Sequence, residues 1–288
     1  MTIGVVTKPG LADAGDTLLA LEAWLSRRRT SVVWSEAAAA LLAPSAERWV
    51  SSLDDLPRTV DVVLVLGGDG TLLGMAGRIA AANADIPLLG VNFGSLGFLT
   101  EITRPELFTS LEAVISGSAT HDLRMLLRAR SLGTALSTHV ALNDIVFSRP
   151  SGARLLELGV WVGDQFVTTI RADGLIIASP TGSTAYSLSA GGPIVHPAMD
   201  ALILTPIAPH TLSNRPIVIP AERDVRVRMT AAATGDGMLV TFDGQTTLEV
   251  PASTDIVVGR APRPMRLIRA SARSYFDVLR EKLGWHQR

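Results

Sequence analysis

VDVVLVLGGDGTLL, residues 60–73, is an apolar run that ends in three glycines around Asp69 and then continues as a helix-like segment. An unbroken apolar run of this length is typical of a strand buried on both faces of a parallel sheet. Glycines at the following turn let the backbone approach a ligand and present N–H groups to it, which favours an anion. The stretch therefore predicts an α/β sheet with a phosphate-binding turn. The carboxylate of Asp69 within that turn suggests phosphate chemistry rather than phosphate binding alone.

Strand-like and helix-like patterns alternate on both sides of this stretch through the first 120 residues. Apolar residues recur at helical spacing from Leu18 to Leu25, and Thr103 and Glu106 form a capping box before a later helix. We predict strands at 3–7, 32–34, 61–66 and 86–91, and helices at 18–27, 45–50, 72–82 and 103–117. Such alternation is typical of a parallel α/β sheet that binds ligands at the carboxyl ends of its strands.

The pattern changes near His121, where strand-like runs follow one another with turns between them. Gly163-Asp164 and Asp243-Gly244 each separate two such runs, which is typical of β-hairpins. Helical spacing returns at 275–283, and this C-terminal helix is expected to pack on the first domain. The sequence thus predicts an N-terminal, Rossmann-like parallel α/β domain of residues 1–120 plus 267–288. A C-terminal, β-sandwich-like all-β domain is predicted for residues 121–266.

The composition excludes several classes of protein. The chain has 288 residues, no cysteine and a formal charge of −1, which argues against disulfides, cysteine-bound metals and nucleic-acid binding. No apolar run approaches the ~18 residues that cross a bilayer, and Met1 leads into a strand-like segment without a signal-peptide pattern. The histidines show no metal-ligand spacing, and no G-x-S-x-G hydrolase elbow is present. We expect a cytoplasmic protein that binds neither nucleic acid nor membranes.

The glycine cluster at 67–71 differs from the two commonest nucleotide-binding loops. It lacks the Gly-Lys-Ser/Thr of a Walker A loop, and Gly68, Gly70 and Gly74 give the wrong spacing for G-x-G-x-x-G. A second glycine loop, at 92–98, follows the next predicted strand, so both loops are expected at one edge of the sheet. A structural strand-to-helix turn with Asp69 as a helix cap is the alternative interpretation.

The densest group of polar and glycine residues lies at 171–194. Hydroxyl side chains between Thr181 and Tyr186 follow a predicted strand and offer short-range hydrogen bonds suited to a nucleotide. A hydroxyl-rich turn that caps the next helix is the alternative. Arg171 and Asp173 are two residues apart on a predicted strand, so we expect them on one face of it.

Together these segments resemble the NAD kinase family over most of the chain and in the same order. The glycine cluster alone is only moderately specific, because lipid kinases and phosphofructokinases resemble the family there, whereas the long 171–194 segment is the specific signature. The matching segments are GGDGT at 67–71, NFGSLGFL at 92–99, LND at 142–144, RADGLI at 171–176, SPTGSTAYSLSAGGPI at 179–194, TPIAPHTLSNRPIV at 205–218 and DGQ at 243–245.

The resemblance implies phosphoryl transfer from ATP, or from inorganic polyphosphate, to the 2′-hydroxyl of the adenosine ribose of NAD, which gives NADP. It implies that Asp69 is the general base on that hydroxyl and that a divalent cation, Mg²⁺ or Mn²⁺, accompanies the donor. It also implies a homodimer or homotetramer. The protein ligands of the metal stay unassigned.

Further residues receive roles only from the resemblance. The phosphate loop would comprise Gly67, Gly68, Gly70 and Thr71, with Gly70 also against NAD. Asn143 and Asp144 would hold the ribose and pyrophosphate side of NAD. The adenine would be surrounded by Phe93, Thr184, Ala185 and Tyr186. Arg171 and Asp173 would approach the nicotinamide half, across a subunit contact. Further NAD-binding positions would be Arg154, Thr181, Ser189 and Gln245.

One position departs from the family pattern. The family usually has Asn-Glu where this chain has Asn143-Asp144. The shorter side chain retracts the carboxylate, so we expect a direct contact with substrate to become water-mediated.

Two other functions are open alternatives. A lipid kinase of the diacylglycerol type shares the glycine cluster, but it should show Asn-Glu soon afterwards, where this chain has Leu72-Leu73-Gly74. A pyridine-nucleotide sensor would bind NAD without turnover, and an intact Asp69 argues against it.

Overall fold

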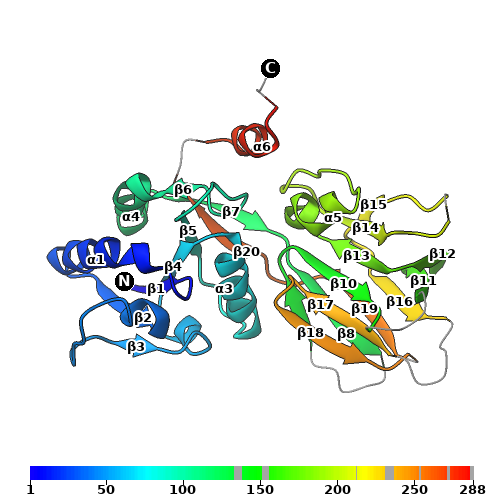
Figure 1. Cartoon of the computed structure of the whole chain (residues 1–288), viewed down its shortest axis with the longest axis horizontal. Coiled ribbons are helices and arrows are strands. Elements are labelled where there is room, and N and C mark those ends of the chain that lie inside the picture. Colours follow the sequence, from blue (N-terminus) through cyan, green and yellow to red (C-terminus); the bar gives the residue numbers. More distant parts are fainter. Residues whose placement is uncertain are drawn as a thin grey trace. The chain divides into compact units, whose positions relative to one another are not determined.

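The computed structural model describes residues 1–132, 138–150, 156–211, 213–230, 237–252, 254–270 and 273–285. The chain forms two compact units, one comprising Met1–Leu123 with Met265–Arg288 and the other Arg124–Pro264. The first unit contains a sheet with helices and the second is rich in β-strands (Figure 1). The predicted fold class, α/β followed by all-β, is confirmed.

The α/β unit is built on a sheet with strand order β3-β2-β1-β4-β5-β20-β7, in which β6 also pairs with β5. Its strands are β1 (Thr2–Thr7), β2 (Ser31–Ser35), β3 (Val50–Ser51), β4 (Val62–Gly67), β5 (Leu88–Asn92), β6 (Ile102–Thr103), β7 (Thr120–Arg124) and β20 (Met265–Arg269). Its helices are α1 (Gly15–Arg27), α2 (Glu36–Ala39), α3 (Asp69–Ala81), α4 (Leu107–Ile115) and α6 (Tyr275–Leu283), with 3₁₀ turns η1 (Ala12–Ala14), η2 (Leu56–Arg58) and η3 (Arg104–Glu106).

The strand order of this sheet reverses between β1 and β4. Both strands pair in parallel, and the chain runs outward from β1 through β2 and β3 before it restarts at β4 on the other side of β1. Open α/β sheets bind ligands at such a reversal, outside the carboxyl ends of the strands. Here those ends are Thr7 and Gly67.

The helices bury the apolar stripes that the sequence spacing predicts. One core joins α1 and α4 to the side chains of β1, β4 and β5, and each fully buried aliphatic side chain contributes roughly 1.5–3 kcal/mol. The members from α1 and α4 are Leu18, Leu21, Trp24, Leu25, Leu107 and Leu111. On α3, Leu72 lies so close to Gly90 of β5 that a Cβ on this glycine would be 2.6 Å from Leu72 Cδ1. Gly90 therefore lets α3 approach the strand that precedes the second glycine loop.

The C-terminal segment belongs to the α/β unit. β20 pairs in parallel with β5, and α6 begins at a capping box in which Ser274 and Asp277 exchange hydrogen bonds of 2.8 and 3.2 Å. Val278 and Leu279 of α6 are buried. The predicted C-terminal helix is confirmed.

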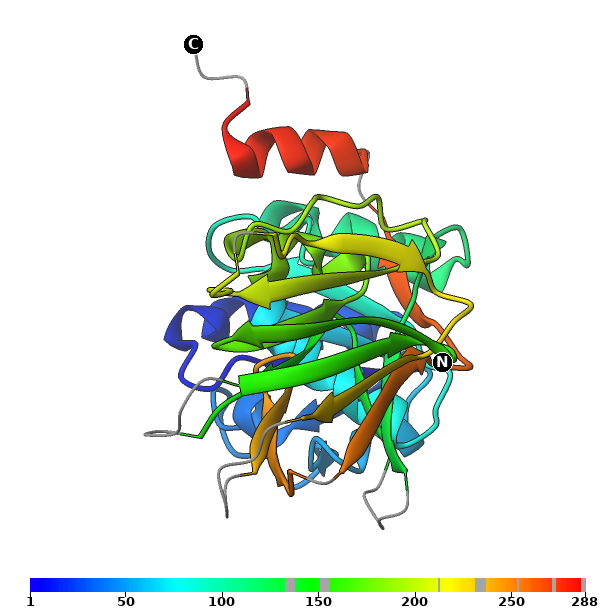
Figure 2. The ribbon, with the colours of Figure 1, turned by 90° about the vertical axis from the view of Figure 1, so that its right-hand side faces the viewer.

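The β-rich unit consists of two antiparallel sheets, with orders β15-β14-β13-β10-β17-β18 and β12-β11-β16-β19-β8-β9. Figure 2 faces these strands, which run in green, yellow and orange. The first sheet comprises β10 (Asp144–Ser148), β13 (Gly174–Ala178), β14 (Ala201–Ile207), β15 (Ile217–Pro220), β17 (Met238–Phe242) and β18 (Thr246–Val250). The second comprises β8 (Leu127–Leu132), β9 (His139–Ala141), β11 (Leu156–Val162), β12 (Gln165–Ala172), β16 (Val225–Met229) and β19 (Asp255–Arg260). Short helical segments are η4 (Thr181–Thr184) and α5 (Tyr186–Ser189).

Inward side chains of both sheets form one apolar core, as in a β-sandwich. The chain passes from the second sheet to the first at Asp173, between β12 and β13. A Cβ on the next residue, Gly174, would overlap the carbonyl oxygen of Phe147, so this corner requires glycine. The two predicted hairpins are present, with positive φ at Gly163 (57°) in one turn and at Asp243 (50°) and Gly244 (65°) in the other.

Three local predictions are wrong. Residues 45–50 form no helix, because the carbonyl of Trp49 accepts the N–H of Trp34 at 2.8 Å and draws this segment beside β2. The helix predicted from residue 72 begins at Asp69, because Gly68 is extended and serves as its N-cap. Arg171 and Asp173 do not share a strand face, since β12 ends at Ala172.

Within the described parts of the chain, no helix is both long and apolar enough to cross a membrane.

Candidate functional site

The turn between β4 and α3 leaves its backbone open. Gly68 and Gly70 have no positive φ, and a Cβ built on either would meet nothing within 4 Å. Neither backbone conformation nor internal packing therefore requires glycine there, whereas a ligand pressed against the backbone would. Gly67 is different, because its Cβ would lie 2.8 Å from Thr71 Oγ1.

The N-terminus of α3 faces this turn without a side-chain cap. Gly68 is the N-cap residue and supplies no side-chain acceptor to the thirteen-residue helix. The first N–H groups of a helix lack intrahelical partners and carry the positive end of its dipole. The turn therefore offers hydrogen-bond donors and partial positive charge to an anion.

The carboxylate of Asp69 is held by the end of the second glycine loop and the two residues that follow it. Its Oδ2 accepts the N–H of Phe98 at 2.8 Å. Its Oδ1 accepts the N–H of Leu99 at 3.2 Å and both the N–H and the Oγ–H of Thr100, at 2.9 and 2.8 Å. Because a carboxylate oxygen has about two acceptor positions, Oδ1 is saturated and Oδ2 keeps one free. Asp69 therefore joins the two glycine loops and is not a helix cap.

A buried pair of polar side chains fixes that second loop. The amide Nδ2 of Asn92 donates to Thr100 Oγ1 at 2.9 Å and to the carbonyl of Ser95 at 2.8 Å. Thr100 is 0% exposed and Asn92 is 6% exposed. A Cβ on Gly97 would overlap the carboxylate of Asp69, so the loop closes on Asp69 only with glycine there. The orientation of Asp69 thus depends on Asn92, Gly97 and Thr100.

Phe93 begins the second loop and is tied to the first. Its N–H donates to the carbonyl of Gly67 at 2.9 Å. The guanidinium of Arg104 lies 4.8 Å from the centre of its ring and covers one face of it. A base that stacks on Phe93, as the resemblance implies, must therefore use its other face or its edge.

The β-rich unit contains a pocket of about 640 Å³ lined by several of the predicted substrate-binding residues. The predicted residues among its lining are Asn143, Asp144, Asp173, Ala185 and Tyr186. Polar groups and apolar side chains such as Val146 and Ile207 share the wall. This mixture of a concave, half-apolar wall and a few convergent polar groups is typical of a small-molecule site.

Two neighbouring carboxyl groups, those of Asp144 and Asp243, line this pocket. Asp243 accepts the N–H groups of Leu142, Asn143 and Asp144 at 2.8, 2.7 and 3.1 Å. Asp144 is 4% exposed, and burial, followed by the negative charge of Asp243, raises its pKa to about 7. Burial also raises the pKa of Asp243. The pocket therefore holds a carboxyl group that changes protonation near neutral pH.

Arg171 and Asp173 both form ion pairs. Arg171 lies on β12, outside the pocket wall, and pairs with Glu157 at 2.7 Å, whereas Asp173 lines the pocket and pairs with Arg149 at 3.5 Å. Arg154 lies outside the described residues.

The hydroxyl groups of residues 181–184 mostly form hydrogen bonds with nearby backbone carbonyl groups. Thr184 donates to the carbonyl of Thr181, and buried Ser183 bonds to Pro180 and Val195. The hydroxyl of Thr181 is buried without a partner among the described residues. Ser189 ends α5, and Gln245 is exposed beside the Asp243-Gly244 turn. Ala185 and Tyr186, not the hydroxyls before them, are therefore what this segment presents to the pocket.

Sequence reasoning missed two residues that organise these sites. Thr100 follows the second glycine loop and carries no local signal of its contact with Asp69. The sequence pattern places Asp243 in a hairpin turn, and only its position in the DGQ segment distinguishes it from other turn residues.

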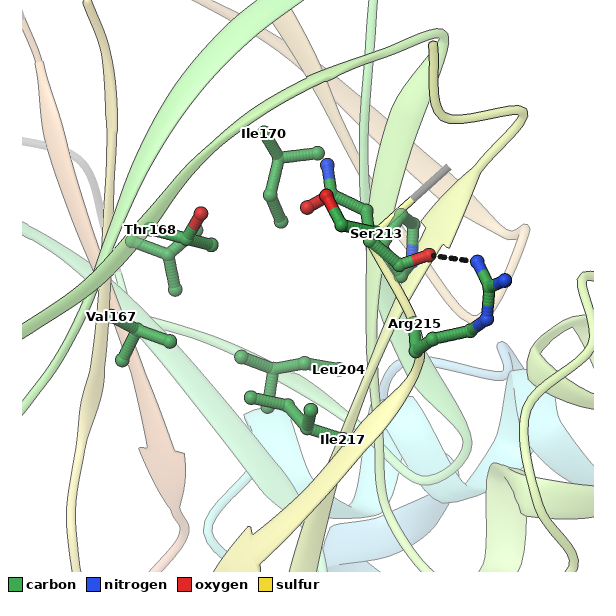
Figure 3. Close-up of a pocket in the computed structure, with 10 residues that line it drawn as sticks. Val167, Thr168, Ile170, Leu204, Ser213, Arg215 and Ile217 are labelled. Atoms are coloured by element: carbon green, nitrogen blue, oxygen red, sulfur yellow. Dashed lines mark hydrogen bonds between the residues drawn. The ribbon is translucent and has the colours of Figure 1, made fainter. Parts of the chain in front are cut away.

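A second, smaller pocket lies on the other side of β14, because side chains alternate along the strand and put Leu204 and Pro206 on the face opposite Ile207. Figure 3 shows Leu204 with Thr168 and Ile217 in its lining. It is about 320 Å³ and mostly apolar, with Ser213, Asn214 and Arg215 at its rim. The side-chain nitrogen of Asn214 is buried without a partner among the described residues. None of the predicted site residues lines it.

Two family profiles match most of the chain. The profile of the ATP-NAD kinase N-terminal domain matches residues 3–119, and that of the ATP-NAD kinase C-terminal domain matches residues 142–270.

Similar proteins agree with this match. An NAD kinase of Magnetococcus marinus is 43% identical over 99% of this chain and 93% of its own length. One of Heliobacterium modesticaldum is 43% identical over 98% of both chains. The crystal structure of yeast NADH kinase with NADH aligns with a TM-score of 0.87 and 26% identity, over 100% of this chain and 89% of the yeast chain. That of an Archaeoglobus fulgidus NAD kinase with ATP aligns with a TM-score of 0.75 and 25% identity, over 99% and 98%. The chain therefore belongs to the NAD kinase family, the enzymes that phosphorylate NAD to NADP.

Proposed function

We propose that this protein transfers the terminal phosphoryl group of ATP to the 2′-hydroxyl of the adenosine ribose of NAD. The observation that carries the proposal is the open backbone at Gly68 and Gly70 directly beside a carboxylate fixed by four hydrogen bonds. Phosphoryl transfer asks mainly for positioning and charge neutralisation, which such a turn supplies.

Asp69 is proposed as the general base. Its Oδ1 is saturated by Leu99 and Thr100, so Oδ2 is the oxygen left to accept the proton of the ribose hydroxyl. Fixing the carboxylate in one orientation before the substrate arrives favours the transfer, because a base must lie within hydrogen-bond reach of its proton.

The pocket of the β-rich unit is proposed to hold NAD. Asn143 and Asp144 would bind the ribose and pyrophosphate side, and Ala185 and Tyr186 would lie against the adenine. Asp173 would approach the nicotinamide half, and Arg171 would do so only after its exposed pairing with Glu157 opens. An ionised Asp144 accepts hydroxyl hydrogen bonds more strongly than a neutral one.

A divalent cation, Mg²⁺ or Mn²⁺, is proposed to arrive with the donor. Among the described residues no group of three or more His, Cys, Asp or Glu side chains could hold a metal ion. Mg²⁺ in phosphoryl-transfer sites keeps several waters and is held largely by the substrate's phosphates, so it does not need a cage of protein ligands. The cation would neutralise charge on the transferred group.

We further propose a homodimer or homotetramer in the cytoplasm. Phe166, Val167, Ile217 and Val218 on the outer strands β12 and β15 are exposed apolar side chains that a second copy would cover. Light scattering in solution tests this; a monomer at all concentrations would contradict it.

The function itself is tested by product identification. The purified protein is incubated with NAD, ATP and Mg²⁺, and NADP is assayed with an NADP-specific dehydrogenase. NADP formation is the expected result. Diacylglycerol is offered as acceptor in a parallel assay, and its phosphorylation would support the lipid-kinase alternative. Binding of NAD without NADP formation would instead support a sensor.

A further inference from the structure

Nearly all basic residues of the chain are arginines. Of its 26 basic residues only Lys8 and Lys282 are lysines. Both belong to the α/β unit, and both lie against one of the two glycine loops that meet at Asp69. Arg104, which covers one face of Phe93, is a further described cation at the second loop.

Lys8 lies at the point where the strand order reverses. It is the first residue after β1, and its N–H donates to the carbonyl of Leu66 at 3.1 Å, which holds it alongside the end of β4. A Cβ built on Gly67 would lie 3.4 Å from Lys8 Cβ, so the lysine stem starts beside the first glycine of the turn. Its side chain is exposed. The ammonium group is therefore free to reach a ligand bound at the turn.

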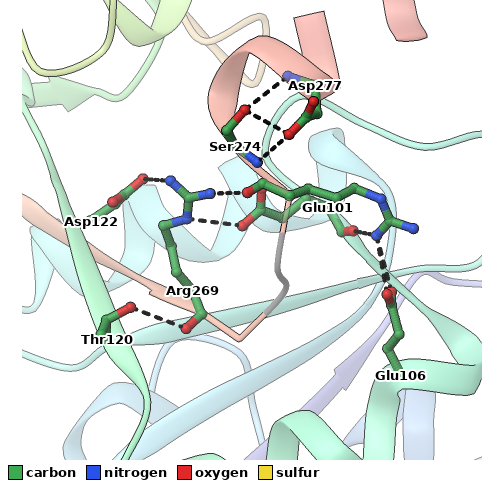
Figure 4. A network of polar contacts seen from close by, with 8 residues as sticks. Glu101, Glu106, Thr120, Asp122, Arg269, Ser274 and Asp277 are labelled. Carbon is green, nitrogen blue, oxygen red and sulfur yellow. Dashed lines mark hydrogen bonds and ion pairs between the residues drawn. The ribbon is translucent and has the colours of Figure 1, made fainter.

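Lys282 lies on α6 against the second loop. Its Nζ is 5.7 Å from the ring centre of Phe98, whose N–H binds Asp69 Oδ2 at 2.8 Å. The polypeptide before α6 is held just beyond this loop, because Arg269 pairs with Glu101 at 3.4 Å (Figure 4). Arg273 also donates to the carbonyl of Glu101, at 3.0 Å. These contacts place a second lysine beside the residue that orients Asp69.

Neither lysine has a carboxylate partner among the described residues. Arginines of the same unit are paired, for example Arg78 with Asp54 at 2.9 Å and Arg266 with Asp85 at 2.8 Å. Lys8, beside the turn that leads into an uncapped helix N-terminus, and Lys282, beside Phe98, add positive charge near a backbone that is open to an anion. A compact ammonium on a flexible stem is well suited to phosphate oxygens.

We propose that Lys8 and Lys282 bind the chain of phosphate groups of the phosphoryl donor. The proposal rests on the proposed function. The 67–71 turn contains no basic residue, and the two lysines would supply the positive charge. Lys8 would contact the phosphates over the 67–71 turn, and Lys282 would reach them from the side of Phe98. ATP and inorganic polyphosphate share this chemistry, so both are predicted to use the lysines.

The test compares charge-free variants with a matched control. Lys8→Met and Lys282→Met each remove one of these charges, and Lys8→Gln is a second charge-free variant at the first position. The control Arg58→Met removes an exposed charge from η2. This turn precedes β4, at the end of the strand away from Gly67. KM and kcat are measured for ATP and for NAD, and binding of ATP and of inorganic tripolyphosphate is measured by calorimetry.

Each lysine variant is expected to weaken ATP binding, and Lys8→Met to raise KM for ATP about tenfold or more, as for loss of a hydrogen bond to a charged group. KM for NAD and the kinetics of Arg58→Met should stay near wild type. Equal loss of ATP and tripolyphosphate binding assigns the contact to the phosphates. A shift in KM for NAD instead, or unchanged donor binding, overturns the inference. Absence of NADP formation by the wild type would contradict the proposed function, a result separate from these.

Discussion

Thr100 donates both its backbone N–H and its hydroxyl to the same oxygen of Asp69, Oδ1, at 2.9 and 2.8 Å. The hydroxyl in turn accepts the amide of Asn92 at 2.9 Å, so its proton has one direction in which to point. The proposed base is thus oriented by a threonine thirty-one residues away, which itself does not need to touch the substrate.

Replacing Thr100 tests this positioning role. Thr100→Val keeps the shape but removes the hydroxyl, and kcat is expected to fall roughly tenfold with KM for NAD little changed, since a hydrogen bond to a charged group is lost. Thr100→Ser keeps the hydroxyl and should restore most of the rate. Equal kinetics in the valine and serine variants would show that the hydroxyl does not position Asp69.

The open turn predicts opposite effects on stability and activity for one substitution. Gly70→Ala places a methyl group in open space within the first turn of α3, and helical Ala in place of Gly stabilises by about 0.5–1 kcal/mol. The same methyl group would press against bound phosphates, so kcat/KM for ATP should fall.

Gly77→Ala is the matched control for that substitution. Gly77 lies in the same helix and its Cβ would also meet nothing within 4 Å. It should gain similar stability in thermal unfolding without losing activity. If Gly70→Ala and Gly77→Ala keep wild-type kinetics alike, no ligand approaches Gly70.

The close packing at Gly97 predicts a loss that a neighbouring glycine does not share. A Cβ on Gly97 would overlap the Asp69 carboxylate, so Gly97→Ala should displace Asp69 and lower kcat. A Cβ on Gly94 would lie 3.8 Å from Asn92 Oδ1, an ordinary contact, so Gly94→Ala should keep most of the activity. Steady-state rates of the two variants check the difference, and similar losses would contradict it.

The raised pKa of Asp144 predicts a pH-dependent stability. Its pKa is about 7 in the folded state against 3.8 as the ordinary value, so between these pH values the folded state binds more protons than the unfolded state. The free energy of unfolding should therefore fall as pH rises from about 4 to 7, by up to ~1.4 kcal/mol per pH unit from this group.

Asp144→Asn removes that contribution. Its unfolding free energy relative to wild type should rise from pH 5 to pH 7 and then level off, as measured by denaturant unfolding. Asp164→Asn, on an exposed hairpin turn, is the control and should show no such trend. A constant difference between Asp144→Asn and wild type at all pH values would rule out the titration.

Local patterns in the sequence predict much of the fold. The unbroken run before Gly67 marks β4, the capping box at Thr103 marks the start of η3 and α4, and the turns at Gly163 and Asp243 mark two hairpins. Segment 45–50 fails because pairing of Trp49 with Trp34 decides its conformation, and this contact has no signature within the segment.

The candidate site can be predicted only in part from the sequence, because some of its residues act through contacts with distant parts of the chain. Asp69 stands out because a carboxylate among glycines is unusual. Thr100 and Asp243 do not, since each acts through contacts with residues 31 and about 100 positions away in the chain. Such contacts depend on the assembled sheet edges rather than on local spacing.

The central claim is that Asp69 takes the proton of the ribose hydroxyl during phosphoryl transfer. The most direct measurement is the rate of NADP formation by Asp69→Asn beside wild type, with NAD affinity measured on the same preparations. The account predicts retained NAD binding and a turnover lowered by ~10²–10⁴, the usual contribution of a general base. Turnover near that of the wild type would contradict it.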